Sequence, residues 1–491
     1  MIRRRGLLAG GVALLAAPAA ATPLDDTLRV TWTDALTTLD PYATPLRTGM
    51  MLAHEFHDGL IHRDPETLQL RPLLARSWRL TADRMAIDFE LATDVRFHDG
   101  TLFGPDDVIA TVARARRPDV AVPSNYTWLA GAERTATGVR LRLAHPFPPA
   151  LAYLAMVLPI LPADGAPGVG TGPYSASLSP DGTIDLLRNE GYVAGAKPRP
   201  SIPRIRISQR PDDLGAPFAD LIAGRADWIW QLNPAQFAVG LTATTWQAVR
   251  AESMRVTYLQ FDAAGRAEPN GPMTRVVVRR AIMRAIDRSA LATIAIAGGA
   301  RVAEAPCYPT QFGCGGSPDD FPSFDPATAR TELASIGFGG GFATELVTYL
   351  RFDIVAAVVA SLDAIGVRAR VTQLPASEAM TRAEAGHAPL FLGSWGSWSI
   401  NDVSAILPAF FGGGPLDAAR QPELTALIDE GNQAAHADAR RAAYGRAIGL
   451  IGRDALFLPL YDDGATYGVS RRLAFRAEGD ELPRFHRMSW R

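Results

Sequence analysis

Residues 353–374, DIVAAVVASLDAIGVRARVTQL, constrain the fold more than any other stretch of the sequence. The first half has helical periodicity, Gly366 breaks it, and the second half alternates as a strand with Val367, Ala369 and Val371 inward. A helix followed directly by a strand is typical of α/β layers with parallel strands. The sequence therefore predicts the α/β fold class.

Other segments fit the same class. Period-two alternation predicts half-buried strands at AIDFEL (86–91), GVRLRL (138–143) and IPRIRIS (202–208). Pro105 starts a helix with Asp106 and Asp107 in its first turn, and Asp325 caps a second helix that Gly337 ends. Residues 422–462 predict two helices and a returning strand.

Length and charge limit the number of domains and the class of partner. A chain of 491 residues with 47% hydrophobic content holds material for two or three domains. With 49 basic and 51 acidic residues the net charge is -2, which gives no electrostatic reason for a nucleic-acid or anionic-membrane partner.

The N-terminus predicts export. Residues 1–21 combine the basic run Arg3, Arg4, Arg5 with an apolar stretch over 7–17 and small residues at 19–21, the pattern of a cleaved signal peptide. The order of arginines and leucines also approaches a twin-arginine signal, so both export routes stay open. No later apolar run reaches the ~18 residues of a membrane span. We expect an exported, soluble protein without membrane insertion.

The two cysteines, Cys307 and Cys314 in CYPTQFGC, form a close pair in a Pro/Gly-rich loop. In an oxidising compartment such a pair predicts a local disulfide, with two free thiols as the alternative. Because the spacing is not CxxC and no third ligand type clusters nearby, a redox or metal role is disfavoured.

The segment HEFHDGLIH contains His54, Glu55, His57 and His62. A zinc-protease helix needs its two histidines four residues apart, whereas here they are three apart and Gly59 interrupts the pattern. We interpret them as ordinary polar positions at a helix end. GxSxG and a phosphate-binding glycine loop are absent from the sequence, so we expect no enzyme, no metal and no cofactor.

Seven segments occur in the order seen in one protein family. They are LDPYATP, HDGLIHRDPETLQLRPLLARSWRLTADRMAIDFEL, VRFHDGTLFGPDDVIATVARA, GTGPY, MTRVVVRRAIMRAIDRSAL, FDPATARTELASIGF and LPLYDD. The chain resembles the family 5 extracellular solute-binding proteins, the dipeptide, oligopeptide and nickel receptors of bacterial ABC importers, from about Leu28 to its C-terminus. Residues 97–108, FHDGTLFGPDDV, are the most specific part. Where the family usually has Tyr-Glu-Gly-Leu, residues 57–60 read HDGL, which explains the histidines as local variation.

The resemblance implies a two-lobed, hinge-closing (type II) periplasmic binding protein with an extra inserted domain. Mapped onto this sequence, lobe I takes 24–55, 168–262 and 458–491, the inserted domain 56–167, and lobe II 263–457. Hinge crossings are expected near 260–264 and 459–462. Closure by hinge motion would bury a ligand and present the closed form to a permease.

The stretch GSWGSWSINDV (393–403) marks the expected cleft. In similar peptide-binding proteins an Asp after the first Trp meets the ligand's α-amino group. Aligning Trp395 with that Trp puts Trp398 at the position of the Asp, while Asp402 matches a later Asp. We expect Trp395 and Trp398 to line the cleft and the usual carboxylate–ammonium pair to be missing. The alternative places Trp398 in the core of the second lobe.

Further ligand-binding candidates follow from the resemblance. Arg351 falls where similar proteins place an arginine near a ligand carboxylate, or else it is a solvated residue at a helix start. Asp34 lies where the first lobe approaches the ligand. Tyr258, Gln260, Asn401 and Asp402 complete the candidates.

The expected function is a periplasmic protein that captures a small solute by lobe closure and delivers it to an ABC permease. A peptide is the first expectation for the ligand, and an opine, modified amino acid, oligosaccharide or metal chelate the alternative. An exported hydrolase, and a chaperone or sensor of the same fold, are competing interpretations. Because the lobes must move freely, we expect a monomer.

Overall fold

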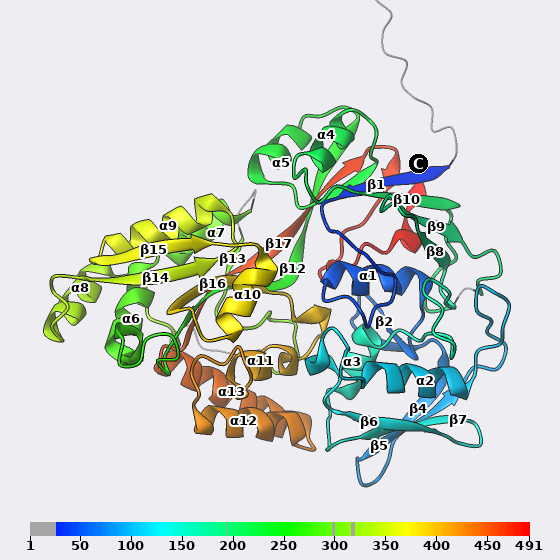
Figure 1. The fold of residues 1–491 in the computed structure, drawn as a ribbon, viewed down its shortest axis with the longest axis horizontal. Helices are drawn as coiled ribbons and strands as arrows, with labels where there is room; N and C mark the ends of the chain where they lie inside the picture. The colour runs from blue at the N-terminus through cyan, green and yellow to red at the C-terminus, as the bar shows by residue number, and fades with distance from the viewer. Residues whose placement is uncertain (1–25, 194, 297–299, 316–319) are drawn as a thin grey trace, which may run out of the picture.

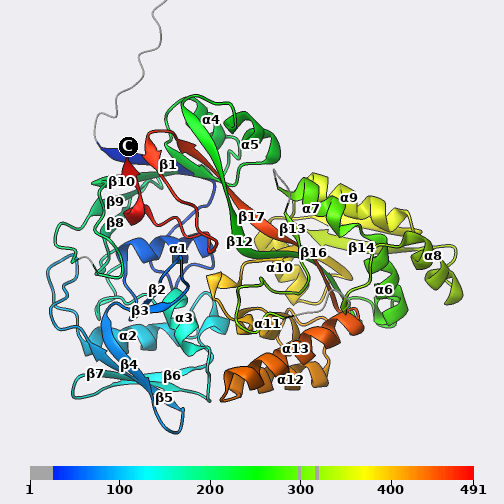
Figure 2. The same cartoon turned by 180° about the vertical axis from the view of Figure 1, so that it is seen from behind.

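The computed structural model describes residues 26–193, 195–296, 300–315 and 320–491 (Figure 1). The predicted signal peptide, residues 1–21, lies outside this part of the chain. Two lobes stand side by side, and a third body, made of β2 to β7 with α2 and α3, lies against the first lobe (Figure 1). The long strands β12 and β17 cross between the lobes, as the view from behind also shows (Figure 2).

An 11-stranded mixed sheet runs through both lobes. Its order is β15-β14-β16-β12-β17-β11-β1-β10-β9-β8, with β13 paired to β17. The first-lobe elements are β1 (Thr27–Trp32), α1 (Arg47–Phe56), β8 (Tyr174–Leu178), β9 (Ile184–Arg188), β10 (Arg204–Gln209), α4 (Ala216–Ile222), β11 (Trp228–Trp230) and α5 (Pro234–Gly240), with the short β18 (Leu473–Ala474) and β19 (Ser489–Trp490) near the C-terminus. Since β1 is parallel to β10 and β11, the carboxyl ends of these strands meet at the edge that faces the other lobe (Figure 1).

The inserted domain is an antiparallel sheet, β4-β5-β7-β6, with α2 against β6 and β7. Its elements are β2 (Ile61–Arg63), β3 (Leu70–Pro72), β4 (Ala75–Leu80), β5 (Ala86–Leu91), α2 (Pro105–Ala115), β6 (Leu129–Arg134), β7 (Gly138–Leu143) and α3 (Ala150–Val157). The alternation predicted for β5 and β7 is confirmed, because Ile87, Phe89, Val139 and Leu141 are all buried. α2 begins at Pro105, as predicted.

The second lobe covers its strands with helices on both faces (Figure 1). Its elements are α6 (Val276–Ala285), α7 (Arg288–Ala295), β13 (Arg301–Val302), α8 (Pro326–Ser335), β14 (Phe342–Thr348), α9 (Phe352–Asp363), β15 (Val367–Gln373), α10 (Ala376–Glu384), β16 (Leu390–Trp395), α11 (Leu407–Phe411), α12 (Pro422–Gln433) and α13 (Ala437–Arg453). Asp325 caps α8 by accepting from the amide of Thr328, 3.0 Å away. The parallel pairing of β14 with β15 confirms the α/β prediction.

One detail of that prediction is wrong. Val367 is buried and Ala369 half-buried, but Val371 is 38% exposed. β15 is the terminal strand of the sheet, so it has a neighbouring strand, β14, on one side only. Val371 instead lines an open apolar groove with Phe352 and Val359 of α9.

The crossing between the lobes is made by β12 (Trp246–Phe261) and β17 (Phe457–Ser470), which pair antiparallel along most of their length. Their register shifts between Glu252 and Val256 and again between Thr257 and Tyr258. A break in the ladder increases local twist and bends a strand. In β12 these register shifts lie several residues before the hinge crossing predicted at 260–264. The predicted domain boundaries stay predictions.

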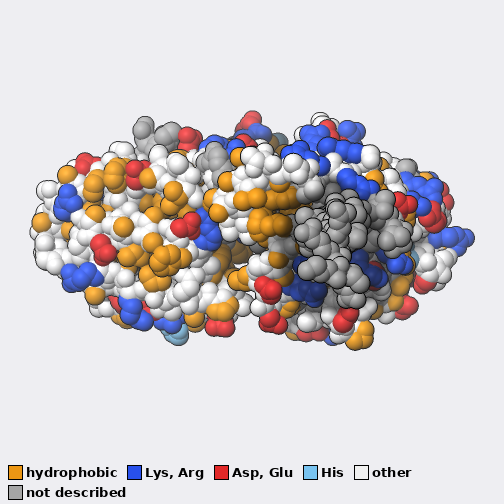
Figure 3. Space-filling model, turned by 90° about the horizontal axis from the view of Figure 1, so that it is seen from above, with side chains coloured by type: hydrophobic (Ala, Val, Ile, Leu, Met, Phe, Trp, Pro, Cys, Tyr) orange, Lys and Arg blue, Asp and Glu red, His pale blue; other side chains and the backbone are white. Residues whose placement is uncertain are grey.

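The predicted disulfide between Cys307 and Cys314 is confirmed, with the two Cα atoms 5.8 Å apart. It closes the loop that follows β13. Seen from above, hydrophobic side chains are spread in small patches over both lobes, with charged groups between them (Figure 3).

Candidate ligand site between the lobes

A tight turn follows β16 at the carboxyl edge of the second lobe. Ser397, Trp398 and Ser399 have φ values of 49°, 49° and 58°, so three consecutive non-glycine residues adopt left-handed conformations. Each such residue costs on the order of 1 kcal/mol. Contacts outside the turn must therefore hold it in this shape.

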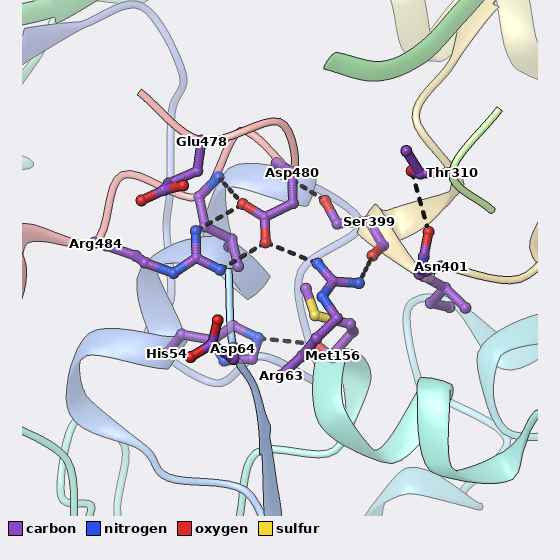
Figure 4. Close-up of polar contacts among 12 residues, drawn as sticks. His54, Arg63, Asp64, Met156, Thr310, Ser399, Asn401, Glu478, Asp480 and Arg484 are labelled. Carbon is purple, nitrogen blue, oxygen red and sulfur yellow. Dashed lines mark hydrogen bonds and ion pairs between the residues drawn. The ribbon is translucent and has the colours of Figure 1, made fainter. Parts of the chain in front are cut away.

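Those contacts come from the other two bodies of the molecule. The Ser399 hydroxyl donates to the carbonyl of Asp480 at 2.6 Å and accepts from Arg47 of α1, and the Ser399 carbonyl accepts from Arg63 of β2. Arg63 also pairs with the Asp480 carboxylate at 2.7 Å (Figure 4). The turn thus joins the second lobe to the first lobe and to the inserted domain.

Asp480 is the centre of this junction. Arg484 donates to both of its oxygens at 2.7 and 2.6 Å (Figure 4). Burial alone would raise the pKa of Asp480, but Arg484 and Arg63 hold it far below its ordinary value. The junction is therefore ionised across the physiological pH range.

Trp395, at the end of β16, and Trp398, in the turn, have different surroundings. The Trp395 indole donates to the carbonyl of Ala405 at 2.9 Å, and its ring meets Phe410 edge-on. Trp398 packs against the core of the inserted domain, a cluster that also contains Ile400. Both tryptophans are only partly buried. The alternative interpretation of Trp398 as a residue of the second-lobe core does not match this packing.

Two arginines lie beside the glycine between the tryptophans. A Cβ atom on Gly396 would lie 3.2 Å from a terminal nitrogen of Arg255 and 3.6 Å from Nε of Arg47. Both arginines pair with Glu481, whose other oxygen accepts from the hydroxyl of Ser253. Burial would raise the pKa of Glu481, but Arg47 and Arg255 lower it to about 2.

A cavity of about 230 Å³ lies next to the strand crossing. Glu252, Arg301, Tyr308 and Asp462 are among its lining residues. Asp462 pairs with Arg301, but its Oδ1 has no hydrogen-bond partner. Burial raises the pKa of Asp462 to about 7, so this carboxyl group titrates near neutral pH.

The histidines of HEFHDGLIH are structural in this fold. His54 contacts the carbonyl of Met156 at 2.9 Å, and Glu55 accepts from His486. Burial lowers the pKa of His54 to about 4 and that of His57 to about 3, so both are neutral at pH 7. Among the described residues, no group of three or more His, Cys, Asp or Glu side chains is arranged to hold a metal ion.

Several predicted site residues lie away from the turn. Tyr258 is fully buried, with its ring stacked on Phe457 at 4.4 Å between centroids. The amide of Gln260 donates to the carbonyl of Leu416, also in the interior of the second lobe. Arg351 pairs with Asp353 and donates to the carbonyl of Ala295.

The remaining predicted residues lie nearer the junction. Asp402 is 3% exposed and accepts from Arg440 through both oxygens, at 2.9 and 2.8 Å. The Asn401 side chain accepts from Thr310 at 3.4 Å (Figure 4). Asp34, in the loop after β1, accepts from the hydroxyl of Thr48 in α1. Trp395 ends β16, and Trp398 and Asn401 follow it on either side of Ser399, which accepts from Arg47 of α1.

Sequence reasoning missed Arg47, Arg255 and Glu481. One signal was available for Arg255, because it is a charged residue in the otherwise uncharged run SMRVTYLQF, which alternates as a strand. No local pattern marks Arg47 or Glu481, whose roles depend on contacts between segments more than 400 residues apart.

Comparison with known proteins identifies the family. Residues 69–417 match the bacterial extracellular solute-binding proteins, family 5. The chain belongs to this family. It is 28% identical over 406 residues to the glutathione-binding protein GsiB of Pectobacterium atrosepticum, covering 78% of this chain and 76% of the relative.

Solved structures share the fold. A dipeptide-binding protein from Pseudoalteromonas sp. SM9913 in complex with Met-Leu has a TM-score of 0.82 at 18% identity, covering 95% of this chain and 100% of the other. NikA from Brucella suis in complex with Fe(III)-EDTA has a TM-score of 0.80 at 21% identity, with the same coverage. The family 5 protein described here is thus a two-lobed solute-binding protein that captures a substrate for an ABC importer. In the described part of the chain, the helices are too short or too polar to span a bilayer.

Proposed function

We propose that this family 5 protein is exported to the periplasm, where, as a monomer and without catalysis, it captures a small peptide or peptide-like solute. Nucleic acid is not among its proposed partners. The observation that carries this proposal is the strained turn Ser397–Ser399, which reaches from the second lobe to both other bodies. A solute enclosed beside this turn would contact all three, so that binding favours the closed arrangement.

The proposed contact residues are Trp398 in the turn, Trp395 and Asn401 on either side of it, and Asp34 from the opposing lobe. Indole rings offer flat surfaces for stacking and for cationic groups. Tyr258, Gln260 and Asp402 are proposed to support these residues from the core, since their polar atoms or rings are packed or buried. Arg351 stays a weaker candidate, because Asp353 already occupies its guanidinium.

Similarity supports a peptide-like ligand without fixing it. The relatives include proteins named for glutathione and solved with a dipeptide or with Fe(III)-EDTA. An opine, oligosaccharide or metal chelate is therefore the second candidate class of ligand. The experiment below distinguishes it from a peptide.

The test is mass spectrometry of the small molecules released when the purified mature protein is denatured. A peptide or one peptide-like compound is the expected result. Release of a single non-peptide compound would transfer the proposal to the second class, and a protein that neither retains nor binds any small solute would overturn capture itself.

A matched pair of variants then tests the turn. Replacing Trp398 by Ala removes a ring worth about 1.5–3 kcal/mol of burial, so the released compound should bind about 10- to 100-fold more weakly by calorimetry. Trp78→Ala is the control, because Trp78 packs on the same core but lies in β4. Equal affinity of parent and Trp398→Ala would contradict the proposed contact.

A further inference from the structure

The loop 307–314, which the disulfide closes, reaches across the break in the crossing strands. It follows β13 in the second lobe, but the Tyr308 hydroxyl donates to the carboxylate of Glu252 in β12. Glu252 lies on the first-lobe side of the register shift, because residues 246–252 of β12 pair with 464–470 of β17, which also pairs with β11. This contact therefore ties a loop of the second lobe to the first lobe.

The surroundings of Tyr308 fix its hydroxyl as the donor. Tyr308 is 5% exposed, and the guanidinium carbon of Arg301 lies 5.4 Å from the centre of its ring. Burial and the hydrogen bond to Glu252 raise the pKa of Tyr308 well above its ordinary value, so the hydroxyl keeps its proton. A hydrogen bond to a carboxylate is stronger than one between neutral groups. The contact thus stabilises the arrangement in which Glu252 and the loop are close.

One buried side chain extends this contact to the strained turn. The Tyr308 N–H donates to Oε1 of Gln311 at 2.9 Å, and Nε2 of the same amide donates to the carbonyl of Ile400 at 2.9 Å. Gln311 is 2% exposed, so both bonds are shielded from water. Ile400 follows Ser399 directly. A continuous chain of hydrogen bonds, the relay Glu252–Tyr308–Gln311–Ile400, therefore joins the strand crossing to the turn.

The far side of the loop is fixed to the residues that follow the turn. The Phe312 N–H donates to the carbonyl of Asn401 at 3.0 Å, and the Phe312 carbonyl accepts from the Val403 N–H at 3.1 Å. The Thr310 hydroxyl donates to the Asn401 side chain (Figure 4). Because a disulfide closes the loop, its conformational freedom is small. A displacement of Tyr308 would therefore reach the turn and would not be absorbed within the loop.

We propose that Tyr308 and Gln311 are positioning residues for solute capture, which couple the strand crossing to the turn Ser397–Ser399. A hinge motion at the crossing changes the distance between Glu252 and the loop, since the two lie on opposite sides of the register shift. The turn is then held in its strained shape only in the arrangement that keeps the relay intact. This inference rests on the proposed ligand site at the turn and adds residues that act on it without contacting a solute.

Hydrogen exchange, followed by mass spectrometry of protein stripped of solute, tests the relay. Tyr308→Phe removes the hydroxyl and almost no volume. Peptides that contain residues 399–403, whose amides are hydrogen-bonded within the turn and to the loop, should exchange about 3- to 10-fold faster, which corresponds to the loss of one hydrogen bond. Peptides from β14 in the same lobe should keep the parental rate, because only a general loss of stability would accelerate both.

Tyr174→Phe is the matched control. The Tyr174 hydroxyl donates to the carbonyl of Ile202 at 3.1 Å in the first lobe, so the same group is lost away from the crossing and exchange at 399–403 should not change. Parental exchange at 399–403 in Tyr308→Phe, or equal acceleration in β14, would overturn the relay.

Substitutions at the acceptor test the same contact from the other lobe. Glu252→Gln keeps an acceptor for the Tyr308 hydroxyl and should accelerate exchange at 399–403 less than Glu252→Ala does. Combining Glu252→Ala with Tyr308→Phe should add nothing to either substitution alone, as a double-mutant cycle would show. Additive effects of the two substitutions would refute a role of Tyr308 through Glu252.

Affinity separates this inference from the proposed ligand site. The compound released by the denatured parent protein should bind about 3- to 10-fold more weakly to Tyr308→Phe, and with parental affinity to Tyr174→Phe, by calorimetry. Parental affinity in Tyr308→Phe with weakened binding in Trp398→Ala would refute the inference alone. Parental affinity in both would refute the proposed site as well. Release of no compound would count against capture and would leave the exchange rates to decide the relay.

Discussion

The pair Asp402–Arg440 offers the sharpest test of how the turn is supported. Arg440, on α13, donates to both Asp402 oxygens at 2.9 and 2.8 Å, donates to the carbonyl of Gly431, and lies 4.4 Å from the ring centre of Phe312. Asp402 and Arg440 are 3% and 6% exposed. Replacing Arg440 by Met keeps much of the side-chain volume but leaves a buried carboxylate without its counter-charge.

Breaking a buried pair on one side costs about 3–5 kcal/mol. We therefore expect Arg440→Met to lower the free energy of unfolding of the second lobe by that amount at pH 7, measured by urea denaturation followed by circular dichroism. Lowering the pH should recover part of this loss, because the unpaired Asp402 becomes neutral. Adding Asp402→Asn should recover it in a similar way, as a double-mutant cycle would show.

The neighbouring residue provides the control. Arg441 pairs with Asp438 on the exposed side of α13, where Asp438 is 98% exposed, and such a surface pair is worth about 0–1 kcal/mol. Arg441→Met should therefore cost less than about 1 kcal/mol. Equal effects of the two substitutions would refute the assignment of Asp402 as a structural carboxylate.

Three further predictions follow from the same contacts. Burial raises the pKa of Asp462 to about 7, so the folded protein keeps this proton at pH values where the unfolded chain has lost it, and the free energy of unfolding should fall as the pH rises from about 4 to 7. Asp462→Asn should make the melting temperature depend less on pH between pH 5 and 8. The same pH dependence in parent and variant would contradict this prediction. Replacing Cys307 and Cys314 by Ser should cost about 2–3 kcal/mol, and a reducing agent should then have no further effect on the melting temperature, whereas equal stability of parent and variant would be unexpected. Ser397→Gly should stabilise the protein by about 1 kcal/mol, because glycine adopts a φ of 49° without strain, and a loss of stability in chemical denaturation would argue against strain in the turn.

The sequence predicted those parts of the fold that local chemistry determines. The Asp325 cap and the Pro105 helix start were correct because they depend on residues within one turn. The alternation in β5 was correct because both neighbours of that strand belong to the same sheet. The prediction that Val371 points inward was wrong, because only the strand order of the sheet shows that β15 is an edge strand.

The candidate site was less predictable because charged contacts join distant segments. Asp402 was predicted near a ligand from its place in the turn, but Arg440, 38 residues later, occupies both of its oxygens. Arg47 and Glu481 are 434 residues apart. A linear pattern carries no information about such a pair until the strand crossing has placed α1 and the C-terminal segment side by side.

The division of roles within GSWGSWSINDV indicates where ligand specificity can change in this chain. Asp402 is fixed by a buried ion pair, and Trp395 is fixed by its bond to Ala405, so substitutions there would disturb the second lobe before they altered a ligand. Gly396 and Trp398 have fewer such contacts within the second lobe, since Gly396 carries no side chain and Trp398 packs against the inserted domain. The strained turn between them is held by arginines that come from outside the lobe. In the proposed site, ligand preference and lobe closure would therefore depend on the same turn and on the arginines that hold it, so a substitution that alters one should alter the other.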